Sequence, residues 1–188
     1  MVSTKEELQD LSENEGVVIG SILVTAEKGP EGESALAGLF KGARAENVEW
    51  SIFIWETGFN PFKTTYHIVV KPASEEIFIK KLPVGSYRVD RMEQIFAGTK
   101  PPRALELHMS VHFSVKPRQT SYIGKLAVDF PHRMRLGSQA KVRVLDASGE
   151  TVEKLRVGHP SIAGNAVKDL ATLEQQWGSP ANPAAVGP

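Results

Sequence analysis

The sequence predicts a mainly β protein, an antiparallel β-sandwich of about eight or nine strands followed by one C-terminal α-helix. Three observations lead to this prediction. Short apolar or alternating segments recur along the chain, glycines and prolines separate them, and no helical segments fall between them as parallel βαβ units would require. With 188 residues, of which 41% are hydrophobic, the chain is long enough for one domain with a sizeable core.

The N-terminal part contains a leader, a strand and a long excursion. Residues 1–15 are predicted to form a flexible leader or a short helix, and the strand at residues 16–24 has Gly20 as its bulge. Residues 25–49 are rich in Gly, Glu and Ala, which predicts either a short helix or a mobile lid. The next segment, WSIFIW at residues 50–55, is apolar on both faces and predicts a central strand in the core.

The clearest strand signal lies at residues 104–115. Six apolar residues from Leu105 to Val115 alternate with polar residues, as in a strand with one buried face. Gly- and Pro-containing turns separate further segments of this kind, and the predicted domain covers residues 16–158. The predicted strands are 16–24, 50–55, 64–70, 76–82, 86–96, 104–115, 121–130, 140–145 and 151–157.

The end of the chain is predicted to be helical and then disordered. Apolar residues recur at steps of three and four from Val167 to Trp177, which predicts a helix within residues 159–177 that begins after Ser161 or Asn165 as its N-cap. Residues 178–188, GSPANPAAVGP, are too poor in hydrophobic side chains to pack and are predicted to be disordered.

Composition disfavours several classes of function. The 22 basic and 22 acidic residues cancel, whereas nucleic-acid binding draws its affinity from an excess of positive charge. No stretch approaches the roughly 18 apolar residues of a membrane-spanning helix. The absence of cysteine excludes thiol catalysis and cysteinyl metal sites in this sequence. We therefore expect no nucleic-acid partner, no transmembrane span and no cofactor.

His108 and His112 lie on the polar face of the clearest strand and are candidate binding residues. Because a strand rises about 3.3 Å per residue, they are roughly 13 Å apart and cannot both bind one metal ion. A third ligand such as His67 or Glu106 could complete a site around one of them, but we expect surface histidines and predict no metal ligand. The paired carboxylates Glu6–Glu7 and Glu75–Glu76 are expected to be solvated.

Aromatic residues around the GFNPF turn form a second candidate surface. Phe59, Phe62 and Tyr66 are the aromatics expected to be exposed, where they could line a groove at the sheet edge. Catalytic residues are not predicted, because the sequence has no nucleophile elbow and no phosphate-binding loop.

Two segments carry a resemblance to a known group of proteins. Residues 78–89, FIKKLPVGSYRV, resemble the pattern F-x-x-x-L-P-x-G-x-Y-x-V, and residues 113–124, FSVKPRQTSYIG, resemble F-x-V-x-P-G-x-x-x-Y-I-G. Together they are similar to uncharacterised bacterial envelope proteins and lipoproteins with prealbumin-like or carboxypeptidase-regulatory-like β-sandwich domains. Arg118 departs from the pattern, which has glycine there. The resemblance implies an Ig-like or prealbumin-like sandwich, an extracytoplasmic location and a non-enzymatic role, with lipid anchoring through a cysteine upstream of Met1.

Three functional hypotheses follow. The first is a non-enzymatic envelope domain that acts through protein–protein or surface contacts. The second is a small-ligand module whose pocket lies under residues 25–49 and receives aromatic contacts from the GFNPF turn. The third is a hydrolase that uses His108 or His112 with Glu106. The sequence leaves the identity of the partner and the oligomeric state open.

Overall fold

A computed structural model of the chain describes residues 11–26, 50–57, 64–71, 74–96, 103–130 and 140–177. The predicted leader at 1–10, most of the 25–49 excursion, the GFNPF turn and the tail at 178–188 lie outside these residues. The described elements are β1 (Glu15–Ala26), β2 (Trp50–Glu56), β3 (Thr65–Val70), β4 (Glu75–Pro83), β5 (Gly85–Phe96), β6 (Arg103–Val115), β7 (Thr120–Phe130), β8 (Lys141–Leu145), α2 (Ser148–Gly158), α3 (Pro160–Gly164), β9 (Ala166–Lys168) and β10 (Thr172–Trp177). The prediction of a mainly β chain is confirmed.

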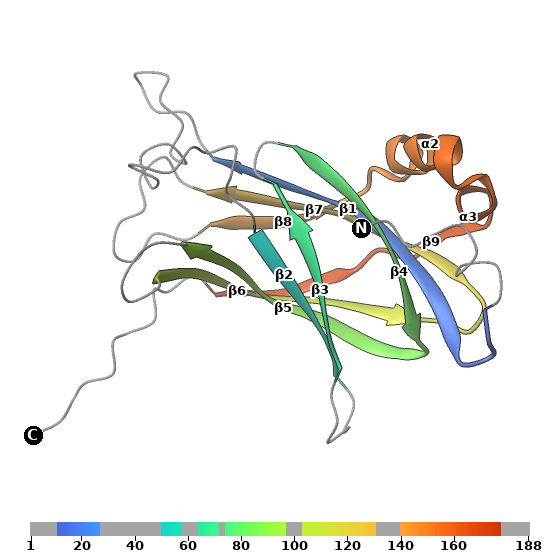
Figure 1. Ribbon diagram of the computed structural model, residues 1–188, viewed down its shortest axis with the longest axis horizontal. Helices are drawn as coiled ribbons and strands as arrows, with labels where there is room; N and C mark the ends of the chain where they lie inside the picture. The colour runs from blue at the N-terminus through green and yellow to red at the C-terminus, as the bar shows by residue number, and fades with distance from the viewer. Residues whose placement is uncertain are drawn as a thin grey trace, which may run out of the picture.

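The strands form two sheets that lie as separate layers (Figure 1). In the first sheet the order is β4-β1-β7-β8, with β9 also paired to β7, and in the second it is β10-β6-β5-β2-β3. Every described pairing in the second sheet is antiparallel. In the first sheet β7 runs parallel to both β1 and β9. The expectation of a purely antiparallel fold is therefore corrected, because periodicity identifies a strand but not the direction of its partner.

Buried residues of both sheets share one core. Trp50 of the second sheet stacks on Phe130 of the first, with ring centroids 5.0 Å apart. In β6 the apolar face is buried from Leu107 to Val115, which confirms the alternation seen in the sequence for the side chains that are described. Within the second sheet, Tyr87 stacks on Phe113 at 5.6 Å between ring centroids. The two layers are thus held together by large side chains directed between them.

Two predicted elements near the C-terminus are wrong. Residues 151–157 were expected to form a strand, but they belong to helix α2, where Thr151 and Leu155 are buried one turn apart. The predicted helix at 159–177 is helical only in α3, which Asn165 ends, and β9 and β10 follow. Residues 166–177 form strands because β9 pairs with β7 and β10 pairs with β6. These long-range ladders outweigh the weak local preference for a helix. Val167, part of the apolar pattern that predicted the helix, is exposed.

Gly20 lies at the predicted bulge of β1. The register between β1 and β7 shifts between Ile19 and Ser21, which confirms this prediction. A Cβ atom at Gly20 would lie 2.8 Å from the carbonyl oxygen of Gly124 and 2.6 Å from Cζ of Phe78. Only glycine permits this approach of the two backbones.

The two turns of the quoted motifs have distinct geometry. In the first, the Tyr87 hydroxyl donates a hydrogen bond of 2.8 Å to the carbonyl oxygen of Pro83, which ties β5 to the turn before it. In the second, Arg118 occupies the left-handed region with φ of 53°. The pattern has glycine at this position, and the backbone angle gives the physical reason for that preference.

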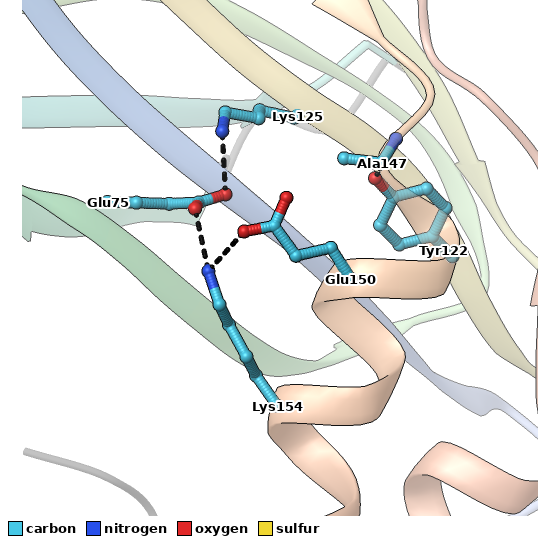
Figure 2. Close-up of polar contacts among 6 residues, drawn as sticks. All are labelled: Glu75, Tyr122, Lys125, Ala147, Glu150 and Lys154. Carbon is cyan, nitrogen blue, oxygen red and sulfur yellow. Dashed lines mark hydrogen bonds and ion pairs between the residues drawn. The ribbon is translucent and has the colours of Figure 1, made fainter.

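Helices α2 and α3 pack on one end of the outer face of the first sheet (Figure 1). Buried Val17, Ile19 and Tyr122 pack there against Leu155 and Ile162 of the helices. The Tyr122 hydroxyl also accepts a hydrogen bond of 3.0 Å from the backbone N–H of Ala147, at the start of α2 (Figure 2). A second, smaller core therefore fixes the helices on this sheet.

An ionic cluster beside this second core anchors α2 (Figure 2). Glu75 of β4 receives Nζ of Lys125 at 3.1 Å and Nζ of Lys154 at 3.0 Å, and Lys154 also contacts Glu150. The side chains of Glu75 and Lys125 are each 15% exposed, so the expectation that Glu75 is solvated is wrong. Burial by itself would raise the pKa of Glu75, but the contacts with Lys154 and Lys125 outweigh it and lower the pKa to about 2.

Backbone strain at the second turn should make Arg118→Gly more stable than Arg118→Ala by about 1 kcal/mol. Both variants remove the exposed ion pair between Arg118 and Glu13, so they differ mainly in the cost of a Cβ atom at positive φ. Chemical denaturation of the two variants measures the difference. Equal stabilities would show that the turn is not strained.

Glu75→Gln should lower the free energy of unfolding at neutral pH by about 2 kcal/mol, because it leaves Lys125 without its charge partner. A depressed folded-state pKa stabilises the fold above the ordinary value of 4.5 and ceases to do so as the pH falls toward about 2. The deficit of the variant should therefore shrink as the pH is lowered through this range. Glu153→Gln, on the exposed surface of α2, is the matched control, and denaturation curves across pH that are the same for both variants would contradict the role of Glu75.

Candidate functional site

The outer faces of the two sheets differ. Helices α2 and α3 pack on the first sheet, whereas none of the described helices or strands packs on the outer face of the second (Figure 1). We call this second surface the open face. Its outward side chains alternate with the buried ones on β2, β3, β5, β6 and β10. Residues of the open face include Phe53, Trp55, His67, Val69, Arg88, Asp90, Arg91, Glu93, His108, Ser110, His112 and Glu174.

Strand register aligns aromatic, arginine and histidine residues in rows across the open face. In one row, Phe53 of β2 lies opposite His67 of β3 and Arg91 of β5, and Arg91 lies opposite His108 of β6. In the next row, Trp55 lies opposite Arg88, which lies opposite His112. Opposite residues are near neighbours on a sheet surface, so the register builds a continuous strip of rings and cations.

Arg91 is the centre of this strip. Its Cζ atom lies 4.8 Å from the centroid of the Phe53 ring and 6.0 Å from that of Trp55, distances at which a cation is attracted to an aromatic face. Its Nε atom is 2.8 Å from Oε1 of Glu93. The sequence predicted core positions for both tryptophans of β2. Trp50 is fully buried, but Trp55 is half-buried on the open face, so the prediction holds only for Trp50.

A hollow of about 270 Å³ adjoins Trp55 at one end of β2. Arg88 and Asp90 line it and pair with each other, with 2.7 Å between Nη2 and Oδ1. Glu56 and Thr57 complete the lining. The hollow therefore combines one aromatic side chain with a guanidinium and two carboxylates, groups that bind hydroxylated or charged ligands.

His112 has two neighbours on one ring nitrogen. Its Nε2 atom lies 2.8 Å from Oγ of Ser110 and 3.2 Å from Oε2 of Glu174. A serine hydrolase needs the hydroxyl and the carboxylate on opposite ring nitrogens, so that one accepts the serine proton while the other is held by the acid. The arrangement seen here is a surface hydrogen-bonded cluster, and it differs from that of a catalytic triad.

The structure describes the side chains of both candidate histidines, but not that of Glu106, their expected carboxylate partner. His108 is exposed on the open face, as the alternation in β6 predicted. The side chain of Glu106 lies outside the described part, and the carboxylate observed at His112 is Glu174 of β10. Sequence reasoning missed Glu174 because it assigned residues 159–177 to a helix. Among the described residues, no three His, Asp or Glu side chains cluster as metal ligands would.

The aromatic candidates have different outcomes. Tyr66 is half-buried, packs against the shared core and meets Tyr87 edge-on at 6.3 Å between ring centroids. Its burial raises the pKa of its hydroxyl. The expectation of an exposed Tyr66 in an edge groove is therefore corrected, because even-numbered residues of β3 face the core. Phe59 and Phe62 lie outside the described residues, as does the pocket expected under residues 25–49.

Comparisons with known proteins add little. No family model matches the chain, and no curated protein matches it. Among solved structures, the chain is similar to a leucine-rich repeat protein from Bacteroides thetaiotaomicron VPI-5482, with 15% sequence identity and a TM-score of 0.38. That match covers 65% of this chain and 15% of the other, and a similarity of this size supports no argument about fold or function. In the part of the chain that is described, no helix has the length and apolar character needed to cross a membrane.

Arg91→Ala should destabilise the protein by about 1 kcal/mol and shift the tryptophan emission to the red, because Trp55 loses the side chain that covers it. Glu93→Gln is the matched control, since it removes the ion pair but leaves the guanidinium over the rings. It should leave the emission unchanged. Emission spectra and denaturation curves that do not distinguish the two variants would contradict the stacked arrangement.

Proposed function

We propose that this chain is a non-enzymatic β-sandwich domain of the bacterial cell envelope that binds a partner protein through the open face. The envelope location is supported by the resemblance of residues 78–89 and 113–124 to envelope β-sandwich proteins. The binding role is supported by one observation above all. Phe53, Trp55 and Arg91 form a stacked cluster on the surface of the second sheet, whereas helices pack on one end of the corresponding surface of the first.

The composition of the open face fits a protein partner. Aromatic residues and arginine are the residue types enriched at the centres of protein interfaces, because they bury large areas with little loss of side-chain freedom. Cations and anions alternate on this surface, as in the pairs Arg88–Asp90 and Arg91–Glu93. A surface of mixed sign favours a partner that also carries both signs, and disfavours a polyanion. Val69, 47% exposed on the neighbouring strand, extends the apolar part of the surface.

A small ligand is the second candidate occupant, and the hollow beside Trp55 favours it. The apolar C–H face of one sugar ring could lie on the indole while Asp90 and Arg88 hydrogen-bond its hydroxyl groups. The pocket expected under residues 25–49 lies outside the described residues, and the hollow beside Trp55 is a separate location for a ligand. The residues of the hydrolase hypothesis, His108 or His112 with Glu106, are not among those that line the hollow.

The protein-partner hypothesis can be tested by site-specific photo-crosslinking in cells that naturally produce the chain. A photoreactive residue replaces Val69 on the open face, and the matched control carries it at Val157, which is 93% exposed on α2. We expect a discrete crosslinked protein from position 69, its loss on adding Arg91→Glu, and no such product from position 157. The same products from both positions would contradict a specific role for the open face. Recovery of the chain in the cytosolic fraction would contradict the envelope location.

The ligand alternative is tested separately on the purified protein. A thermal-shift screen with sugars, nucleotides, lipids and divalent metals detects any ligand that binds the native state, because binding raises the melting temperature by mass action. A sugar-dependent shift that disappears in Trp55→Ala would favour the ligand hypothesis over the protein partner. A shift that persists in this variant would exclude the hollow beside Trp55 as its site.

A further inference from the structure

The edge strand β4 offers a second, separate surface. It is the outermost strand of the first sheet and pairs with β1, and with no other strand in the described part of the chain (Figure 1). An edge strand presents a row of backbone N–H and C=O groups that can pair with a further strand. β4 is nine residues long and half-buried along most of its length.

The register of β1 and β4 shows which backbone groups point outward. It runs without a break from Glu15 opposite Pro83 to Leu23 opposite Glu75, so Asn14 comes opposite Val84. The N–H of Val84 donates to the carbonyl oxygen of Asn14 at 2.8 Å. Because hydrogen-bonded pairs alternate in an antiparallel ladder, the even-numbered residues of β4 bond to β1. The N–H and C=O groups of Glu75, Ile77, Ile79 and Lys81 therefore point away from the sheet.

The charges of β4 are complementary to themselves when the strand is reversed. Residues 75–81 read Glu-Glu-Ile-Phe-Ile-Lys-Lys, with two acids at one end and two bases at the other. If a second copy runs antiparallel with its Phe78 opposite Phe78, each Glu76 lies opposite Lys80 of the other copy. Likewise Glu75 lies opposite Lys81, and Ile77 lies opposite Ile79. Opposite charges and apolar pairs at such positions stabilise an antiparallel ladder.

The same register satisfies the backbone. With Phe78 at the two-fold axis, the outward-facing groups of Ile77 meet those of Ile79, and those of Glu75 meet those of Lys81. A shift that puts Ile79 at the axis would place Glu75 opposite Pro83, which has no N–H group. A shift that puts Ile77 at the axis would separate the acids from the bases. Charge and hydrogen bonding thus select one register independently of each other.

We propose that two copies of this chain associate by antiparallel pairing of their β4 strands about a two-fold axis at Phe78, which joins the first sheets into one. Glu76 and Lys80 lie on the same side of β4 as Phe78, which packs against the shared core. An unrelated strand that carries no opposite charges at these positions would leave Glu76 and Lys80 unpaired, so these two side chains disfavour its addition. Glu75 and Lys81 keep Lys125 and Glu15 as neighbours, so Glu76 and Lys80 set the choice of partner.

Sedimentation equilibrium of the purified chain over a concentration series tests this proposal. The wild type should dimerise, and Lys80→Glu should weaken the dimer about tenfold or more, because Glu76 then faces a like charge at both ends of the axis. Glu76→Lys should do the same. An equimolar mixture of the two variants should dimerise again, and so should the double variant Glu76→Lys, Lys80→Glu. Arg156→Glu, the same charge change on the exposed surface of α2, is the matched control and should leave the dimer intact.

Hydrogen exchange resolves the geometry. As the dimer forms with rising concentration, the amides of Ile77, Ile79 and Lys81 should become protected, while those of Phe78 and Lys80 are protected throughout. A wild type that is monomeric at every concentration would overturn the proposal. Fast exchange of the edge amides in that monomer would show that this edge is free to pair with a different chain. A dimer that is unaffected by Lys80→Glu, or a mixture of single variants that stays monomeric, would overturn it as well. The open face is not involved, so these outcomes are independent of the proposed function.

Discussion

Strand β7 is buried on both of its faces, and the rest of the structure depends on this double burial. Its inward side chains, among them Leu126 and Phe130, enter the core shared by the two sheets. Its outward Tyr122 lies under the helices in the second core. Neighbouring strands also occupy both of its edges, with β1 on one side and β8 and β9 on the other. A strand in this position leaves little backbone or side chain for solvent, so it determines where the helices and the second sheet must lie.

The two outer faces then take different roles because only one of them is apolar enough to need a cover. On the first sheet, Ile19, Ile77 and Ile79 require the helices, and the cluster around Glu75 holds α2 at the correct place. On the second sheet, the outward residues pair among themselves. Arg91 covers Phe53, and His112 is held by Ser110 and Glu174. Because its polar groups pair with one another, this face is stable in water. It nevertheless retains aromatic surface that a partner could bury.

The fold and the candidate site were predictable to different degrees. The alternation in β6 located its buried face and its outward-facing histidines, because one strand with one solvated face has a period of two whatever its neighbours are. The bulge at Gly20 was also predictable, since a lone glycine in a strand indicates a close backbone approach. The partners of two carboxylates, Glu75 and Glu174, were not predictable. Glu75 acquires its two lysines from β7 and α2, and Glu174 reaches His112 only because β10 pairs with β6.

The sequence by itself determined which residues form strands in most of the described chain, the turns at 83–85 and 117–119, and which side of β6 is buried, because these properties follow from local periodicity and turn chemistry. Only the tertiary structure decided the direction of each pairing, the helix at Ser148–Gly158, the strand at Thr172–Trp177 and the division into a covered and an open face. These features depend on contacts between residues far apart in the sequence. The free energy of such contacts exceeds the small intrinsic preferences of short segments, so no local pattern could reveal them.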